Sequence, residues 1–155
     1  MQESLNIDKS DFKNKTDLYN HIADQIKAIV ESERMVIPNL CNTSSVLKMY
    51  LKDINWVGFY LIKGKELILG PFQGKPACIR IPIGKGVCGT AALKNESQVV
   101  VDVDRFPGHI ACDSDSRSEI VIPFRYKGKV IGVLEVQSPL TDRCDHDDKN
   151  GLKLI

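Results

Sequence analysis

Residues 55–72 read Asn55-Trp56-Val57-Gly58-Phe59-Tyr60-Leu61-Ile62-Lys63-Gly64-Lys65-Glu66-Leu67-Ile68-Leu69-Gly70-Pro71-Phe72, and this stretch decides the fold class. Two runs rich in aromatic and branched residues are separated by three residues that include a glycine, which predicts a β-hairpin. A second pair of such runs, Glu119–Phe124 and Lys129–Gln137, flanks Lys127-Gly128. Because a parallel sheet needs a long crossover after each strand, two tight hairpins predict a mainly antiparallel sheet.

The segment between the two hairpins predicts shorter elements. Ala77–Ile83 is expected to form a third strand and Gln98–Val103 a short one. Between them, Lys85–Lys94 predicts a short helix that is opened by glycines. Asp104–Ser118 is dense in Pro, Gly, Asp and Ser, which predicts one long loop.

Helical periodicity precedes the first hairpin. From Thr16 onward, apolar residues recur at steps of three and four, which predicts an amphipathic helix. The pattern breaks at Pro38 and Asn39. A second helix is expected from about Asn42 to Lys52, with Asn42 or Thr43 as its cap.

The length of 155 residues fits a single domain over residues 1–155. The N-terminal helices are expected over about 14–52, the sheet and a pocket over about 54–138, and a C-terminal helix from about 145. The expected fold class is α+β: terminal helices cover one face of the sheet, and the short helix and long loop cover the other.

Charge and cysteine content narrow the class of protein. The net charge is +1, from 21 Lys plus Arg and 20 Asp plus Glu, which argues against a nucleic-acid or membrane partner. No apolar run approaches the ~20 residues that cross a bilayer, and residues 1–9 are polar rather than signal-like. Five cysteines without a secretion signal argue against a structural disulfide framework and favour a cytoplasmic protein.

One glycine motif invites a cofactor interpretation. Residues 84–89 satisfy G-x-G-x-x-G, and Asp104 follows Gly84 by 20 residues. A dinucleotide fingerprint needs a parallel strand–helix–strand unit, which the surrounding hairpins exclude. We therefore expect no cofactor; the glycines are expected to allow a sharp turn and close packing of the helix on the sheet.

Zinc is a further candidate ligand for the cysteines. Cys78, Cys88, His109 and Cys112 are the residues that could bind it. Structural zinc sites usually draw on two tight ligand pairs, but only His109 and Cys112 are closely spaced here. We therefore expect no metal, and a zinc-stabilised domain is the weakest alternative.

The segment Phe106–Ser114 places a cysteine in the long loop. Loops longer than ~12–15 residues in a compact domain are more often functional than accidental. His109 can supply positive charge, and nearby backbone amides can favour a thiolate at Cys112. Cys112 can equally be a small buried hydrophobe under the loop, and the residues alone leave both interpretations open.

Two aromatic and two acidic residues share the predicted sheet. Trp56 and Tyr60 are four apart on one strand and face the same side. They form either ordinary core or an aromatic wall around the apolar or sulfur-bearing end of a small ligand. Glu119 and Glu135 stand in apolar strands, where carboxylates are rarely buried unpaired. A ligand amine, a catalytic proton, or a Lys or Arg side chain would each satisfy them.

Five stretches together resemble a known family. They are Asn55–Tyr60, Leu69–Gly74, Gly84–Ala91, Phe106–Asp113 and Ser118–Val121. From about Asn55 to Asp148 the chain resembles the free methionine-(R)-sulfoxide reductases, which are built on a GAF domain. A generic GAF sensor is not expected to carry Cys78, Cys88 and Cys112 together. The resemblance implies a GAF-like domain and an oxidoreductase that acts on free methionine sulfoxide.

The resemblance implies a role for each of these cysteines. Cys112 is the nucleophile, whose thiolate attacks the sulfoxide sulfur and is left as a sulfenic acid. Cys78 resolves that acid to a disulfide, which thioredoxin reduces, and Cys88 has an auxiliary role. Glu119 is the carboxyl that protonates the departing oxygen, a task for which its pKa must be raised.

The resemblance also implies how the substrate is held. Trp56 and Tyr60 form a wall around its methyl group and sulfur. Backbone amides from Ile110 and Ala111 to Cys112 bind its carboxylate, and carboxylates bind its ammonium group.

The chain departs from the family near the end of its last long strand. The family usually has two aspartates there, two residues apart, and this chain has Glu135 and Gln137. Glu135 keeps the charge on a longer side chain, whereas Gln137 loses it. We therefore expect weaker binding or turnover of methionine sulfoxide, and another ligand stays open.

The alternative function is a GAF domain that binds a small molecule or senses redox state without turnover. The reductase interpretation demands that the α-carbons of Cys78 and Cys112 lie, or can be brought, within about 7 Å of each other. Homodimerisation is implied by resemblance only, because GAF domains commonly pair through their terminal helices.

Overall fold

The computed structural model describes residues 12–155; residues 1–11 of the expected single domain lie outside the described residues. In chain order its elements are α1 (Lys15–Val30), α2 (Val36–Tyr50), β1 (Trp56–Lys63), β2 (Glu66–Gln73), β3 (Arg80–Pro82), α3 (Gly86–Lys94), β4 (Gln98–Val100), the 3-10 helix η1 (Val103–Arg105), β5 (Ser118–Tyr126), β6 (Lys129–Ser138) and α4 (His146–Leu152). Both predicted hairpins are present, as β1–β2 and β5–β6.

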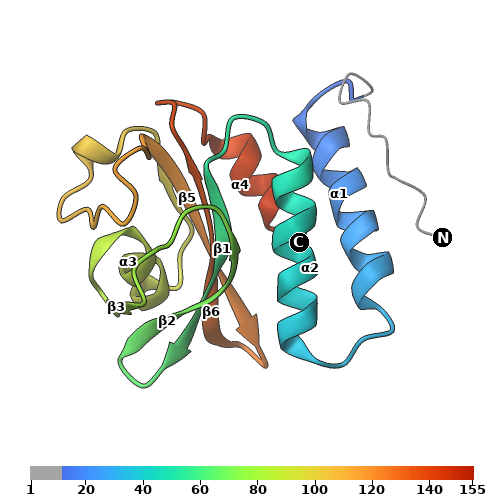
Figure 1. The fold of residues 1–155 in the computed structure, drawn as a ribbon, viewed down its shortest axis with the longest axis horizontal. Coiled ribbons are helices and arrows are strands. Elements are labelled where there is room, and N and C mark those ends of the chain that lie inside the picture. Colours follow the sequence, from blue (N-terminus) through green and yellow to red (C-terminus); the bar gives the residue numbers. More distant parts are fainter. Residues whose placement is uncertain (1–11) are drawn as a thin grey trace.

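The strands form one sheet in the order β3-β2-β1-β6-β5-β4, and every neighbouring pair is antiparallel. Helices α2 and α4 pack on one face, and α1 packs on both of them (Figure 1). Helix α3 and the long loop lie over the other face (Figure 1). The predicted α+β class is confirmed. Among the helices of residues 12–155, none has the length and apolar character that a bilayer crossing requires.

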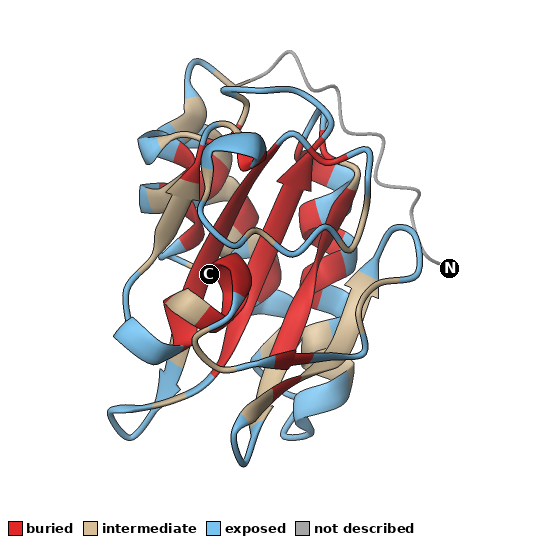
Figure 2. Cartoon of the chain, turned by 90° about the vertical axis from the view of Figure 1, so that its left-hand side faces the viewer, coloured by how far each residue is buried: buried red, intermediate tan, exposed pale blue. Residues whose placement is uncertain are grey.

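The period of two along β1 divides the apolar side chains between two cores. Val57 and Phe59 face α1, α2 and α4, whereas Trp56 and Tyr60 face α3. The central strands are buried along most of their length (Figure 2). The side that carries Trp56 and Tyr60 is therefore a closed interior, covered by α3 and the segments around it.

The second helix begins earlier than predicted. It starts at Val36 rather than near Asn42, its cap is Met35, and Thr43 is buried inside it. Pro38 lies in the first turn, where the amide that proline lacks would have had no helical partner. Proline therefore opens this helix instead of interrupting the pattern.

Two strands are shorter than predicted. Arg80–Pro82 replaces the expected Ala77–Ile83. The strand expected over Gln98–Val103 ends at Val100, because the Asp102 carboxylate accepts the Asp104 amide and starts η1. Cys78 therefore lies in the connection before β3, and β4 leads toward the loop that contains Cys112.

Candidate active site

A disulfide joins Cys78 to Cys112, with the α-carbons 5.4 Å apart and a sequence separation of 34 positions. Cys78 lies in the connection between β2 and β3, and Cys112 lies in the long loop before β5. The spacing demanded by the reductase interpretation is met. Two segments that are distant in the chain thus meet over the α3 side of the sheet.

A cavity of about 10 Å³ lies beside this disulfide. Its lining consists of Ile81, Gly86, Val87, Cys88, Ile110, Cys112, Glu119 and Glu135. Five residues that the sequence pointed to therefore share one chamber: Cys88, Ile110, Cys112, Glu119 and Glu135. A volume this small holds no more than a water molecule, so the disulfide form is closed to a ligand the size of an amino acid.

Neighbouring strands supply the two carboxyls of the chamber. Glu119 projects from β5 and Glu135 from β6, and both are buried. Burial and then the nearby Glu119 carboxylate raise the pKa of Glu135 to about 8. The surroundings of Glu135 therefore favour its protonated form. The resemblance assigns the proton-donating role to Glu119, and Glu135 lies in the same chamber with a raised pKa.

His109 contacts one of the two chamber carboxyls. Its Nε2 atom lies 3.3 Å from Oε2 of Glu119. The hydrogen bond to Glu119 raises the pKa of His109, against the opposing effect of burial. The contact with Glu119, which lines the same chamber as Cys112, therefore favours the positively charged form of His109.

Gln137 connects the chamber to the loop that carries Cys112. Its amide donates to Glu135 across 2.8 Å, and its carbonyl oxygen accepts from the Ser116 hydroxyl across 2.5 Å. Asn55 donates to Ser116 and to Asp113, at 2.9 and 3.0 Å. Asn55 and Ser116 were not predicted as part of the site, because the contacts that Asn55 makes span 58 and 61 residues.

Trp56 and Tyr60 contact the connection that carries Cys78 and do not line the small chamber. Trp56 stacks on Phe72, with ring centroids 5.3 Å apart, and on Tyr60 at 6.0 Å. The Trp56 indole donates to the Lys75 carbonyl oxygen at 3.2 Å, and the Tyr60 hydroxyl donates to the Cys78 carbonyl oxygen at 2.8 Å. In the disulfide form these residues therefore support the backbone around Cys78.

The remaining cysteines differ in their surroundings. Cys88 is buried in α3, and burial, with the Glu135 and Glu119 carboxyls, raises the pKa of its thiol well above the ordinary value. Cys41 is exposed and Cys144 is buried in the helix-side core. Within residues 12–155, no three His, Cys, Asp or Glu side chains converge as a metal site.

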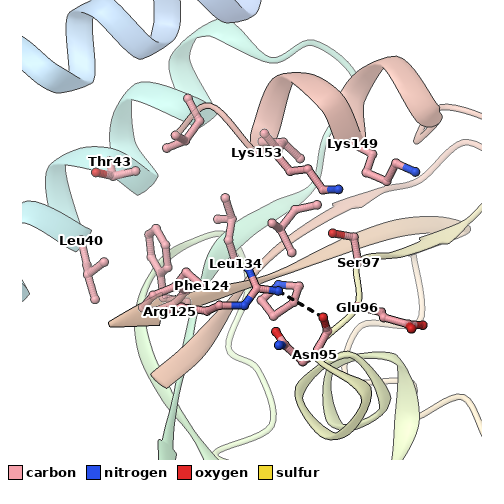
Figure 3. Close-up of a pocket in the computed structure, with 15 residues that line it drawn as sticks. Leu40, Thr43, Asn95, Glu96, Ser97, Phe124, Arg125, Leu134, Lys149 and Lys153 are labelled. Carbon is pink, nitrogen blue, oxygen red and sulfur yellow. Dashed lines mark hydrogen bonds between the residues drawn. The ribbon is translucent and has the colours of Figure 1, made fainter. Parts of the chain in front are cut away.

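A larger cavity, of about 860 Å³, lies on the face of the sheet that α2 and α4 cover (Figure 3). Residues of α2, α4, β5 and β6 line it, with Arg125, Lys149 and Lys153 as its cations. It contains no cysteine. Thiol chemistry therefore belongs to the small chamber on the opposite face.

Comparison with known proteins agrees with this geometry. Residues 15–153 match the GAF domain family. Free methionine-R-sulfoxide reductase of Escherichia coli is 48% identical over 142 residues, which cover 92% of this chain and 86% of that protein. The Saccharomyces cerevisiae protein of the same name is 42% identical over 150 residues, covering 92% and 83%.

The chain belongs to the free methionine-R-sulfoxide reductase family.

Solved structures of this family superpose closely on the chain. The substrate complex of the Neisseria meningitidis free methionine-R-sulfoxide reductase gives a TM-score of 0.88 at 46% identity, covering 92% of this chain and 87% of that one. The substrate complex of fRMsr of Staphylococcus aureus gives 0.83 at 52% identity, covering 87% and 88%. The resemblance inferred from sequence is confirmed, and so is the GAF fold that it implies.

Proposed function

We propose that this protein reduces free methionine-(R)-sulfoxide to methionine, with Cys112 as the nucleophile and Cys78 as the resolving thiol. The observation that carries the proposal is the Cys78–Cys112 disulfide beside a buried chamber with two carboxyls. The activity named for the E. coli and yeast relatives supports the same reaction.

The reaction has two covalent steps. The Cys112 thiolate attacks the sulfoxide sulfur while the oxygen takes up one proton. The hydroxyl then passes from the substrate sulfur to the Cys112 sulfur, the bond between the two sulfurs breaks, and methionine leaves with a sulfenic acid on Cys112. Cys78 then attacks the Cys112 sulfur, the S–O bond breaks, and water leaves as the disulfide forms. Glu119 is the expected donor to the oxygen, and Glu135, with its pKa near 8, supplies a proton held in the same chamber.

Substrate binding requires the chamber to open. The cavity beside the disulfide, at about 10 Å³, is too small for an amino acid. Reduction frees Cys112 and its loop from Cys78. In that state we expect Trp56 and Tyr60 to face the methyl group and sulfur of the substrate. The amides of Ile110 and Ala111 would receive its carboxylate. Its ammonium group would lie beside Glu135, where its positive charge favours release of the Glu135 proton.

Three further expectations rest on the resemblance. Thioredoxin is the proposed reductant of the disulfide, and the cytoplasm is the proposed compartment. Homodimerisation through the terminal helices is the proposed assembly.

A ligand-binding GAF domain without turnover is the second candidate. One observation favours it: Gln137 stands where the family usually has an acid, so the chamber has one less charge for a substrate amine. The two candidates differ in whether bound methionine sulfoxide is converted.

A turnover assay with dithiothreitol as reductant tests the proposal. Wild type is expected to convert the R diastereomer of free methionine sulfoxide and leave the S diastereomer unchanged. Cys112→Ser is expected to abolish conversion, whereas Cys41→Ser, at an exposed cysteine outside the chamber, retains it. Equal turnover by Cys112→Ser and wild type would exclude the mechanism. Binding of the sulfoxide without conversion by wild type would favour the sensor.

A further inference from the structure

The segment that carries Cys78 is fastened to the sheet by side chains. Residues 74–79, named here the Cys78 segment, connect β2 to β3. Trp56 donates to the carbonyl oxygen of Lys75, and Tyr60 donates to that of Cys78. The Ile79 carbonyl oxygen accepts from the Leu69 amide at 3.0 Å. These three hydrogen bonds hold the backbone of the segment against the sheet, and the Lys75 side chain is available to contact the neighbouring loop.

Lys75 reaches the loop that carries the other cysteine. Its ammonium group bonds the Asp115 carboxylate and lies 3.9 Å from Oδ1 of Asp113. Asp113 directly follows Cys112 in the chain and its side chain is only 7% exposed. Among residues 12–155, these are the polar side-chain contacts that join the Cys78 segment to residues 106–117, named here the Cys112 loop.

The Asp113 carboxylate beside Lys75 is itself held in place. Asp113 accepts from the Asn55 amide at 3.0 Å and from the Asp115 backbone amide at 2.9 Å. Asn55 also donates to Ser116, at 2.9 Å, within the Cys112 loop. The Asp113 carboxylate therefore is a fixed negative charge directly beside Cys112, with Asp115 as a second, more exposed one. Lys75 presents the matching positive charge three residues before Cys78.

We propose that Lys75 is a positioning residue for disulfide formation: its ion pairs with Asp113 and Asp115 align the Cys78 segment with the Cys112 loop. This inference rests on the proposed function. In the step concerned, the Cys78 sulfur bonds to the Cys112 sulfur and the S–O bond of the sulfenic acid breaks. The hydroxyl leaves as water with the thiol proton, and no further oxidant is consumed. Lys75 does not touch the reacting atoms, so the first step, which forms methionine, does not depend on it.

A rapid-quench experiment separates the two steps. Fully reduced protein is mixed with excess free methionine-(R)-sulfoxide without any reductant. Methionine is measured by chromatography, and the sulfenic acid and the disulfide by dimedone trapping and mass spectrometry. We expect Lys75→Gln to slow disulfide formation roughly threefold, the size of effect seen for exposed ion pairs. Lys75→Glu should slow it roughly tenfold, because it repels both aspartates. Methionine should form at the wild-type rate in both.

Matched variants distinguish charge pairing from a general structural effect. Lys65→Glu makes the same charge change at the exposed β1–β2 turn and is expected to leave both steps unchanged. Lys75→Arg keeps the pairing and should restore the rate. The reversed pair, Lys75→Asp with Asp115→Lys, should recover most of it. High salt should slow disulfide formation in wild type but not in Lys75→Gln, because screening acts on exposed charges.

The outcomes separate this inference from the proposed function. Unchanged disulfide formation in Lys75→Glu, with normal methionine formation, would overturn the role of Lys75 alone. Equal slowing of both steps would also overturn it, because that result indicates a general loss of structure. Absence of methionine from the wild-type protein would overturn the proposed function itself.

Discussion

The side-chain amide of Gln137 donates a hydrogen bond of 2.8 Å to the Glu135 carboxyl, and both residues are only 6% exposed. An acid at position 137 would place a second negative charge beside Glu135. Gln137 instead supplies a neutral donor to a carboxyl that burial already disfavours as an anion. Gln137 thus adds no negative charge beside Glu135. Substitutions at positions 135 and 137 can therefore test whether Glu135 is protonated.

We expect Glu135→Gln to flatten the pH dependence of stability. Glu135 has a pKa of about 8 in the folded chain, against an ordinary value of 4.5. Below pH 4.5 both the folded and the unfolded states hold the proton. As the pH rises from 4.5 to 8, the unfolded state releases it first, so the free energy of unfolding falls by a few kcal/mol. Urea unfolding of the disulfide form at pH 5 and pH 9 measures this loss.

The variant should lose less stability than wild type between the two pH values, because it has no carboxyl to ionise there. Glu96→Gln, at an exposed glutamate, is the control and should behave as wild type. An equal loss of stability in Glu135→Gln and wild type would refute the raised pKa.

His109→Gln should destabilise the protein mainly at low pH. The partner carboxyl of Glu119 holds the pKa of His109 above its ordinary value of 6.5. A raised histidine pKa stabilises the folded state below pH 6.5, and this contribution disappears as the pH rises through the folded-state value. Calorimetry at pH 5.5 should therefore show a lower Tm for the variant, with a much smaller difference at pH 9. The exposed His146 supplies the control, His146→Gln; a Tm difference for His109→Gln that is independent of pH would rule out the charged pair.

Gln137→Asp should improve substrate affinity at a cost in stability. The substituted carboxylate gives the substrate ammonium group another partner, so we expect KM for free methionine-(R)-sulfoxide to fall several-fold. The free energy of unfolding should fall as well, because a buried charge beside Glu135 lacks a cation in the empty chamber. Steady-state kinetics and urea unfolding measure the two effects, with Gln73→Asp, at an exposed glutamine, as the control. An unchanged or higher KM would show that position 137 does not contact the ammonium group.

Local sequence patterns predicted the fold correctly where these patterns were strong. Lys63-Gly64-Lys65 and Lys127-Gly128 each fix a hairpin, and both strands of each pair formed as predicted. The start of α2 was wrong, because the break assigned to Pro38 is where the helix opens. Proline ends a helix in its interior but is tolerated in the first turn, and the local pattern did not distinguish these positions.

The candidate site was only partly predictable. The period of two placed Glu119 and Glu135 in buried strands, and their convergence on one chamber is observed. The contacts that organise the Cys112 loop could not be foreseen. Asn55 meets Asp113 across 58 residues and Lys75 meets Asp115 across 40, and all four are ordinary polar residues for loops and strand ends. Such pairings depend on how the sheet and loops fold over each other, which short-range patterns do not encode.

Thiol and product stoichiometry in a single turnover tests the central claim most directly. Fully reduced protein is mixed with excess free methionine-(R)-sulfoxide and no reductant, and methionine and free thiols are then counted. The account predicts one methionine formed and two thiols lost per chain, with Cys78 and Cys112 recovered in one disulfide-linked peptide pair. Methionine formed without loss of these two thiols, or a disulfide between any other cysteines, would contradict it.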